Sequence, residues 1–149
     1  MKSIIYVMLC LLCWGCQKKP NMQALLHQAE TLMYTRPDSA YTLLNTIEKP
    51  EHYTVEDYAT WCLLWTQAAD KSFREHTSDS LIRVAVHYFE KQPDRGRLAM
   101  ALYTQGRVEK ELGKTDQAIE SFVKALDIAK KVEDCQTGFL ASSQLGHIY

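Results

Sequence analysis

The most constraining part of this sequence is the stretch from Leu98 to Val132, which carries two helical patterns separated by Gly113-Lys114-Thr115. Apolar residues recur at intervals of three and four on both sides of this break, so each segment places one apolar stripe on an α-helix. Glycine tolerates the positive φ that often ends a helix, and threonine can accept a bond from a free N–H at a helix start. A connector this short predicts two neighbouring antiparallel helices, with Gly113 ending the first and Thr115 capping the second.

Small residues determine how closely these two helices pack. Gly106 on the first helix and Ala118 on the second lie at matching distances from the turn, and Phe122 and Ala125 follow on the second helix. A glycine that faces an alanine lets two backbones approach closely, because neither side chain is large. We therefore expect Gly106 to face Ala118, with Phe122 filling the next layer.

This order of residues resembles the tetratricopeptide repeat (TPR), a helix–turn–helix unit of about 34 residues. The resemblance rests on Leu102, Gly106, Gly113, Ala118, Phe122 and Ala125. Two positions depart from the family: Glu109 stands where an aromatic residue is usual, and no proline follows Ala129. The resemblance implies that the clear repeat at 95–132 is a helical hairpin stacked on other hairpins.

A second copy of the first-helix pattern begins downstream, within 136–149. Leu145, Gly146 and Tyr149 match the family there, including the aromatic residue that the first copy lacks. A repeat needs its second helix to bury its first. We therefore expect either that the native chain continues past Tyr149 or that another chain covers this helix.

Helical spacing also runs through 21–94, where the repeat signature is weaker. Apolar patterns over 21–48 and 54–91 predict two further hairpins, divergent in sequence but TPR-like in size. We therefore predict an all-α fold, in which antiparallel helical hairpins stack as a TPR-like α-solenoid behind an N-terminal signal peptide.

The helix predicted to begin near Val55 is the most aromatic element of the chain. Its apolar and aromatic residues form two rows, which predicts that it is buried on two sides. Trp61 and Trp65 lie in these rows. We interpret them as core residues, and the alternative is that they line a ligand groove.

Residues 1–15 read as a leader rather than as part of the fold. A lysine at position 2 precedes a short apolar run, and Gly15-Cys16 follows. The run is shorter than the ~20 residues that span a bilayer. It resembles a bacterial lipoprotein signal, which implies cleavage before Cys16, lipid on that sulfur and a tether over 16–20. Cys13 and Trp14 depart from the usual signal, and an uncleaved anchor or an unmodified secreted protein remain alternatives.

The folded part retains two cysteines, Cys62 and Cys135, which do not form a disulfide framework. Cys62 lies on an apolar helical face and is predicted to be a small core residue. Cys135 falls between helices. A bridge between the two is an alternative to two free thiols.

No constellation of catalytic residues is found in the sequence. The five histidines show no metal-binding i,i+4 pair, and there is no glycine-rich phosphate loop. We interpret Glu109-Lys110-Glu111 as an exposed charge run, and Asp116 and Glu120 as a solvated face. A formal net charge of −1 without a basic stripe argues against a nucleic-acid partner. We predict neither an enzyme nor a bound metal or cofactor.

The TPR resemblance implies a binding surface, because the first helix of each pair lines the concave side of the stack. Carried onto this chain, the concave residues are Tyr103, Arg107, Lys110, Ser143 and His147. Arg107 has the fork geometry that pairs with a carboxylate, and Tyr103 supplies flat contact area. The alternative is that these side chains are simply solvated.

These observations predict a lipid-anchored, non-catalytic TPR scaffold that binds a protein or peptide in its concave groove. The signal implies a periplasm-facing position in the cell envelope, at the outer membrane because Gln17-Lys18 follows Cys16. The arrangement is similar to that of proteins from Bacteroides-group bacteria. One alternative is the sensor part of a membrane-spanning regulator with a cytoplasmic helix-turn-helix domain. Another is a substrate-binding lipoprotein of a nutrient-uptake system, with its ligand against Trp61 or Trp65.

Overall fold

The computed structural model describes residues 21–148, and within this range the chain is entirely helical, with seven α-helices and no strand. The helices are α2 (Met22–Leu32), α3 (Pro37–Leu44), α4 (Val55–Lys71), α5 (Ser80–Phe89), α6 (Arg95–Glu111), α7 (Thr115–Lys131) and α8 (Cys135–Gly146), with a short 3-10 helix η1 (Pro50–His52) between α3 and α4. The predicted all-α class is confirmed. The leader, the tether with Cys16, and Tyr149 lie outside the described residues. No helix within 21–148 is long and apolar enough to cross a membrane.

Side-chain caps begin most of the helices. Asn21, Thr54, Asp94 and Asp134 each accept a bond from a backbone N–H in the first turn that follows. The cap predicted at Thr115 is wrong: Thr115 is the first residue of α7, and the flanking Lys114 makes no side-chain cap bond. The reason lies in the turn, where Gly113 takes a φ of 75° and Lys114 still belongs to the connector. Gly113 therefore ends α6 as predicted.

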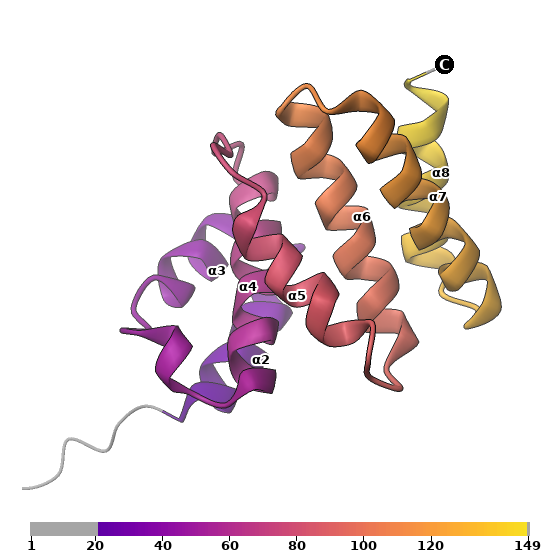
Figure 1. Cartoon of the computed structure of the whole chain (residues 1–149). Helices are drawn as coiled ribbons and strands as arrows, with labels where there is room; N and C mark the ends of the chain where they lie inside the picture. Colours follow the sequence, from indigo (N-terminus) through magenta and orange to yellow (C-terminus); the bar gives the residue numbers. More distant parts are fainter. Residues whose placement is uncertain (1–20, 149) are drawn as a thin grey trace, which may run out of the picture.

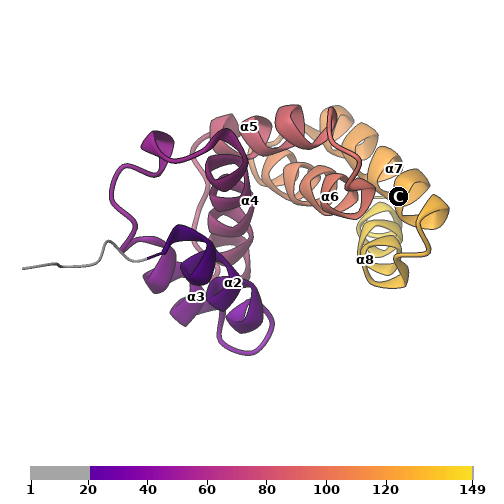
Figure 2. The same cartoon turned by 90° about the horizontal axis from the view of Figure 1, so that it is seen from below.

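Successive helices pack against one another along an arch. Figure 1 shows α6 and α7 side by side, and Figure 2 shows α6 and α8 on the inner side of the arch, with α5 and α7 outside. Contacts also join α4 to α6 and α6 to α8, whereas none join α5 to α7 within the described residues. The helices are therefore closer together on the inner side than on the outer side.

The buried apolar residues form two cores that share α4. The N-terminal core lies among α2, α3 and α4 and includes Leu26, Met33, Leu44, Leu64 and Ala68. The central core lies among α4 to α8 and includes Cys62, Leu63, Ile82, Phe89, Leu98, Leu102 and Val108. Because α4 contributes to both, the prediction that this helix is buried on two sides is confirmed.

Two tryptophans of α4 pack within the fold. Trp61 contacts both cores, and its indole Nε1 donates to the backbone oxygen of Leu44 at 3.1 Å. Trp65 packs on the N-terminal core and donates to Asn45 Oδ1 at 3.1 Å. Both indole N–H groups are thus used inside the protein, which agrees with the interpretation of these residues as packing residues rather than as the wall of a ligand groove.

A glycine of α6 and an aromatic ring of α7 pack closely in the α6–α7 hairpin. A Cβ added at Gly106 would lie 2.6 Å from Cε1 and 2.7 Å from Cδ1 of Phe122, and Phe122 is fully buried. The Phe122 ring therefore lies directly over Gly106 rather than in the next layer. Ala118 and Ala125 of α7 are also fully buried. By contrast, a Cβ at Gly146 would meet no atom within 4 Å among the described residues.

The two cysteines of the described fold are free thiols in different surroundings, so the alternative of a bridge between them is not realised. Cys62 is fully buried, and this burial raises the pKa of its thiol to about 12, although bonds from Tyr58 and the backbone act in the opposite direction. Cys135 is exposed. The thiolate is the reactive form, so the two thiols should differ sharply in reactivity.

We expect iodoacetamide at pH 8 to alkylate Cys135 in the folded protein and to leave Cys62 unmodified until the chain is unfolded in denaturant. Peptide mass mapping after a timed exposure measures both thiols in one sample, so Cys135 serves as the internal control. Equal alkylation of the two under native conditions would contradict the burial of Cys62.

Candidate functional site

The residues predicted for the concave face lie on two neighbouring helices. Helix α6 carries Tyr103, Arg107 and Lys110, which are all half-buried. Helix α8 carries Ser143, which is half-buried, and is followed by His147, which is exposed. Both helices lie on the inner side of the arch (Figure 2). The structure thus brings these two helices into contact.

Arg107 does fork to a carboxylate, but to one in the same chain. Its Nη2 donates to Asp70 Oδ1 at 2.8 Å, and its Nε lies 3.2 Å from both Asp70 carboxylate oxygens. Burial disfavours the charge of Arg107, but the bonds from Asp70 outweigh it and raise the pKa of the guanidinium. Arg107 therefore joins α6 to α4, and the sequence pattern gave no indication of Asp70 as its partner.

The other residues of this set also have partners inside the fold. Lys110 Nζ donates to Gln144 Oε1 of α8 at 3.1 Å. His147 Nδ1 lies 2.6 Å from the backbone oxygen of Ser143. The ring of Tyr103 packs against Phe122 with centroids 5.9 Å apart, and burial is the main cause of its raised pKa. These contacts order the inner face and leave part of each side chain accessible.

A large apolar side chain that the sequence reading missed lies beside this face. Phe73 is 97% exposed and takes a positive φ of 55° just after α4. A hollow of about 430 Å³ lies between the ends of α4 and α6 and is lined by Asp70, Phe73, Arg74, Arg107, Lys110 and Glu111. The sequence does contain a sign of this exposure: Phe73 is an aromatic residue flanked only by polar residues, and it lies in a connector, where no helical face can bury it.

The connector that carries Phe73 is tied to the end of α6. Glu111 Oε1 accepts a bond from the backbone N–H of His76 at 3.0 Å, and its Oε2 lies 2.6 Å from His76 Nδ1. Burial would raise the pKa of Glu111, but the bonds from His76 and the charge of Arg107 outweigh it and lower that pKa. This pair restrains the position of the connector relative to α6.

The charge run predicted at 109–111 is only partly exposed. The interpretation of Glu109 as a solvated residue is wrong. Glu109 is 4% exposed, and its carboxylate accepts hydrogen bonds from Ser121 Oγ and Gln105 Nε2, both at 2.7 Å. The reason is helical geometry. Glu109 follows Gly106 by one turn on the face of α6 that α7 covers, whereas Lys110 and Glu111 point away from it.

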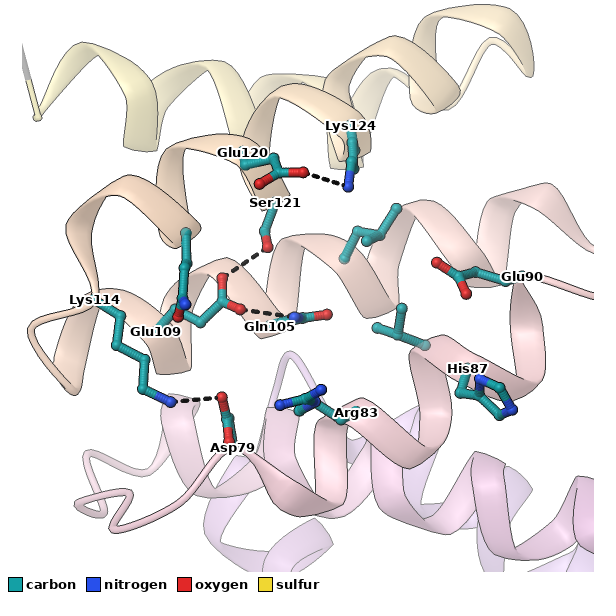
Figure 3. Close-up of a pocket in the computed structure, with 13 residues that line it drawn as sticks. Asp79, Arg83, His87, Glu90, Gln105, Glu109, Lys114, Glu120, Ser121 and Lys124 are labelled. Atoms are coloured by element: carbon teal, nitrogen blue, oxygen red, sulfur yellow. Dashed lines mark hydrogen bonds and ion pairs between the residues drawn. The ribbon is translucent and has the colours of Figure 1, made fainter.

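Glu109 lines a groove of about 400 Å³ on the side of α6 where α5 and α7 do not touch. Figure 3 shows the carboxylate between the two outer helices, with Ser121 on one side and Gln105 on the other. Two ion pairs flank it, Lys114–Asp79 at 2.8 Å and Lys124–Glu120 at 2.7 Å. The bond from Lys114 is the main cause of the lowered pKa of Asp79.

Within residues 21–148, no three histidine, cysteine, aspartate or glutamate side chains are grouped so that they could hold a metal ion. No protein-family model matches this chain, and neither a curated protein nor a solved structure matches it. What the chain does therefore has to be inferred from its residues and their arrangement.

Proposed function

We propose that this protein is a lipid-anchored, non-catalytic scaffold of the TPR type, which binds a protein or peptide partner at the bacterial cell envelope. The observation that carries this proposal is the asymmetry of the helix contacts. Helix α6 contacts both α4 and α8, whereas α5 and α7 do not contact each other. Such an asymmetry is what a curved stack of helical pairs requires, with the first helix of each pair on the concave side.

The chemistry of the inner face supports a peptide or protein ligand. Tyr103 offers a half-buried ring, Lys110 a cation held only by a neutral amide, and Phe73 a fully accessible apolar side chain at the rim. Aromatic side chains are enriched in protein-binding surfaces, and a lysine can pair with a carboxylate of the partner. Arg107 is neutralised by Asp70, so we assign it a positioning role rather than direct contact with the partner.

The anchoring part of the proposal is supported by the sequence of the leader. The short apolar run and Gly15-Cys16 place a lipid-accepting sulfur at the start of the tether, ahead of α2. Acyl chains on Cys16 would hold the helices close to the membrane surface, since each buried CH₂ contributes about 0.8 kcal/mol. This position corresponds to a periplasm-facing lipoprotein, with the outer membrane as the proposed site.

Photo-crosslinking tests the assignment of the inner face. With benzoylphenylalanine at Lys110 on α6, we expect discrete cross-linked adducts after irradiation of intact cells that produce the full chain. Benzoylphenylalanine in place of Asp127, which is exposed on α7, is the matched control and should give none of these adducts. Adducts that form equally from both positions would contradict a concave binding face.

The same cells test the anchor separately. The adducts should be in the membrane fraction, and Cys16→Ser should move them to the soluble fraction without changing their identity. Retention of the Cys16→Ser chain in the membrane would contradict lipid anchoring while leaving the binding face untouched.

A further inference from the structure

We propose that the groove between α5 and α7 is a binding site for an organic cation, whose ammonium or guanidinium group donates to the carboxylate of Glu109. This site lies on the outer side of the arch, away from the face assigned to a protein partner. The two proposals therefore stand or fall independently.

The first reason is that the carboxylate of Glu109 is buried without a cation in direct contact with it. Its two bonds come from neutral groups, the hydroxyl of Ser121 and the amide of Gln105. Among the ion pairs of residues 21–148, none within 4.0 Å involves Glu109. Removing a carboxylate from water without a counter-charge is costly, and two neutral bonds compensate only in part.

The second reason is that Glu109 retains acceptor capacity toward the groove. A carboxylate has about four lone-pair positions, and each oxygen of Glu109 accepts a single bond from within the protein. The groove that it lines has a volume of about 400 Å³, which is within the range of about 300–1,000 Å³ found for small-ligand sites. A donor group in the groove could therefore reach the carboxylate.

The third reason is that both lysines of the groove are already paired with carboxylates other than Glu109. Lys114 is paired with Asp79, and Lys124 is paired with Glu120. Figure 3 shows the guanidinium of Arg83 on the Asp79 side of the groove. Glu90 adds another carboxylate to the lining. The two lysines are therefore not free to pair with Glu109, and the lining carries one more carboxylate than lysine and arginine side chains.

The donor set favours an organic cation over a metal ion. A hard metal ion requires several oxygen ligands around it, whereas the neighbours of Glu109, Ser121 and Gln105, donate to it, and no three acidic, histidine or cysteine side chains within residues 21–148 are grouped to hold a metal. An ammonium or guanidinium group needs only acceptors in the right directions. The same chemistry is presented by a free amine and by a lysine or arginine side chain.

Isothermal titration of the full chain with capped amino acids tests the site. The probes are Nα-acetyl-arginine amide, its neutral isostere Nα-acetyl-citrulline amide, and putrescine as a free diamine. We expect the arginine probe to bind with a Kd of about 1 mM or tighter. The citrulline probe should bind at least about tenfold more weakly, because it lacks the charge that pairs with Glu109. If putrescine binds more tightly than the arginine probe, the ligand is a free amine. If the arginine probe binds more tightly, the ligand is a peptide side chain.

Glu109→Gln removes the charge and nearly preserves the shape, so it should weaken arginine binding at least about tenfold. Glu90→Gln makes the same chemical change at an exposed position of the same groove, releases no lysine from an ion pair, and should leave binding within about twofold. Ser121→Ala is a second variant, which keeps the carboxylate but removes the bond that orients it, and it should weaken binding less than Glu109→Gln. Absence of arginine binding, undiminished binding in Glu109→Gln, or an equal loss in Glu90→Gln would each overturn the proposal.

Discussion

Replacing Gly106 with valine is expected to lower the free energy of unfolding by about 3 kcal/mol, although valine is a better helix former than glycine. An added Cβ would lie 2.6 Å from Cε1 of Phe122, and the two further methyl groups of valine add to the crowding. The Phe122 ring cannot move outward, because it is fully buried and packs against Tyr103. Chemical denaturation followed by circular dichroism measures the loss.

A second substitution identifies the cause of that loss. Phe122→Leu alone should be destabilising, because it leaves a cavity over Gly106. In the double variant Gly106→Val with Phe122→Leu, the valine methyl groups occupy part of that cavity. We expect the double variant to be more stable than the sum of the single effects by about 1–3 kcal/mol.

Gly138 provides a control for the effect of helical propensity alone, without a steric clash. It lies in α8, where an added Cβ would be 3.8 Å from Ala129 Cβ, an ordinary van der Waals contact. Gly138→Ala should therefore be neutral or stabilising by up to about 1 kcal/mol. Additive effects of Gly106→Val and Phe122→Leu would contradict the direct contact between these two positions.

The local features of the fold could be predicted because they depend on short-range geometry. The apolar stripes around the Gly113 break predicted the two helices of the hairpin, which α6 and α7 confirm. Periodicity shows which face of a helix is buried. It does not show which element covers that face. This limit explains why the predictions that Glu109 is solvated and that Phe122 lies one layer away from Gly106 were wrong.

The candidate sites depend on contacts between residues that are far apart in the sequence. Asp70, which binds Arg107, lies 37 positions before it, and Ser121, which binds Glu109, lies 12 positions after it. Three consecutive charged residues at 109–111 suggest solvent exposure when they are considered together. Their shared charge hides the fact that one of the three, Glu109, lies on the helix face that α7 covers. The burial of Glu109 could only have been suspected from the TPR resemblance, where an aromatic residue is usual at that position.

Replacing Trp61 with alanine is expected to lower the free energy of unfolding by about 3–5 kcal/mol. The indole packs against both cores and donates to the backbone oxygen of Leu44, so the substitution leaves a cavity and removes one of the two bonds that this oxygen accepts. Trp61→Phe retains most of the ring and should cost less, with the loss of the hydrogen bond contributing about 1 kcal/mol. Trp65→Ala is the matched control, because Trp65 packs on the N-terminal core alone and bonds a side chain rather than the backbone.

The same variant should also change how the chain unfolds, since Trp61 is an aromatic side chain that contacts both cores. Native-state hydrogen exchange measures the opening free energy of each helix separately. In Trp61→Ala we expect the amides of α2 and α3 to open well before those of α6 and α7, whereas Trp65→Ala should produce a smaller separation. If α2 and α3 remain as protected as α6 and α7 in Trp61→Ala, the two cores are coupled through the backbone of α4 and not through this side chain.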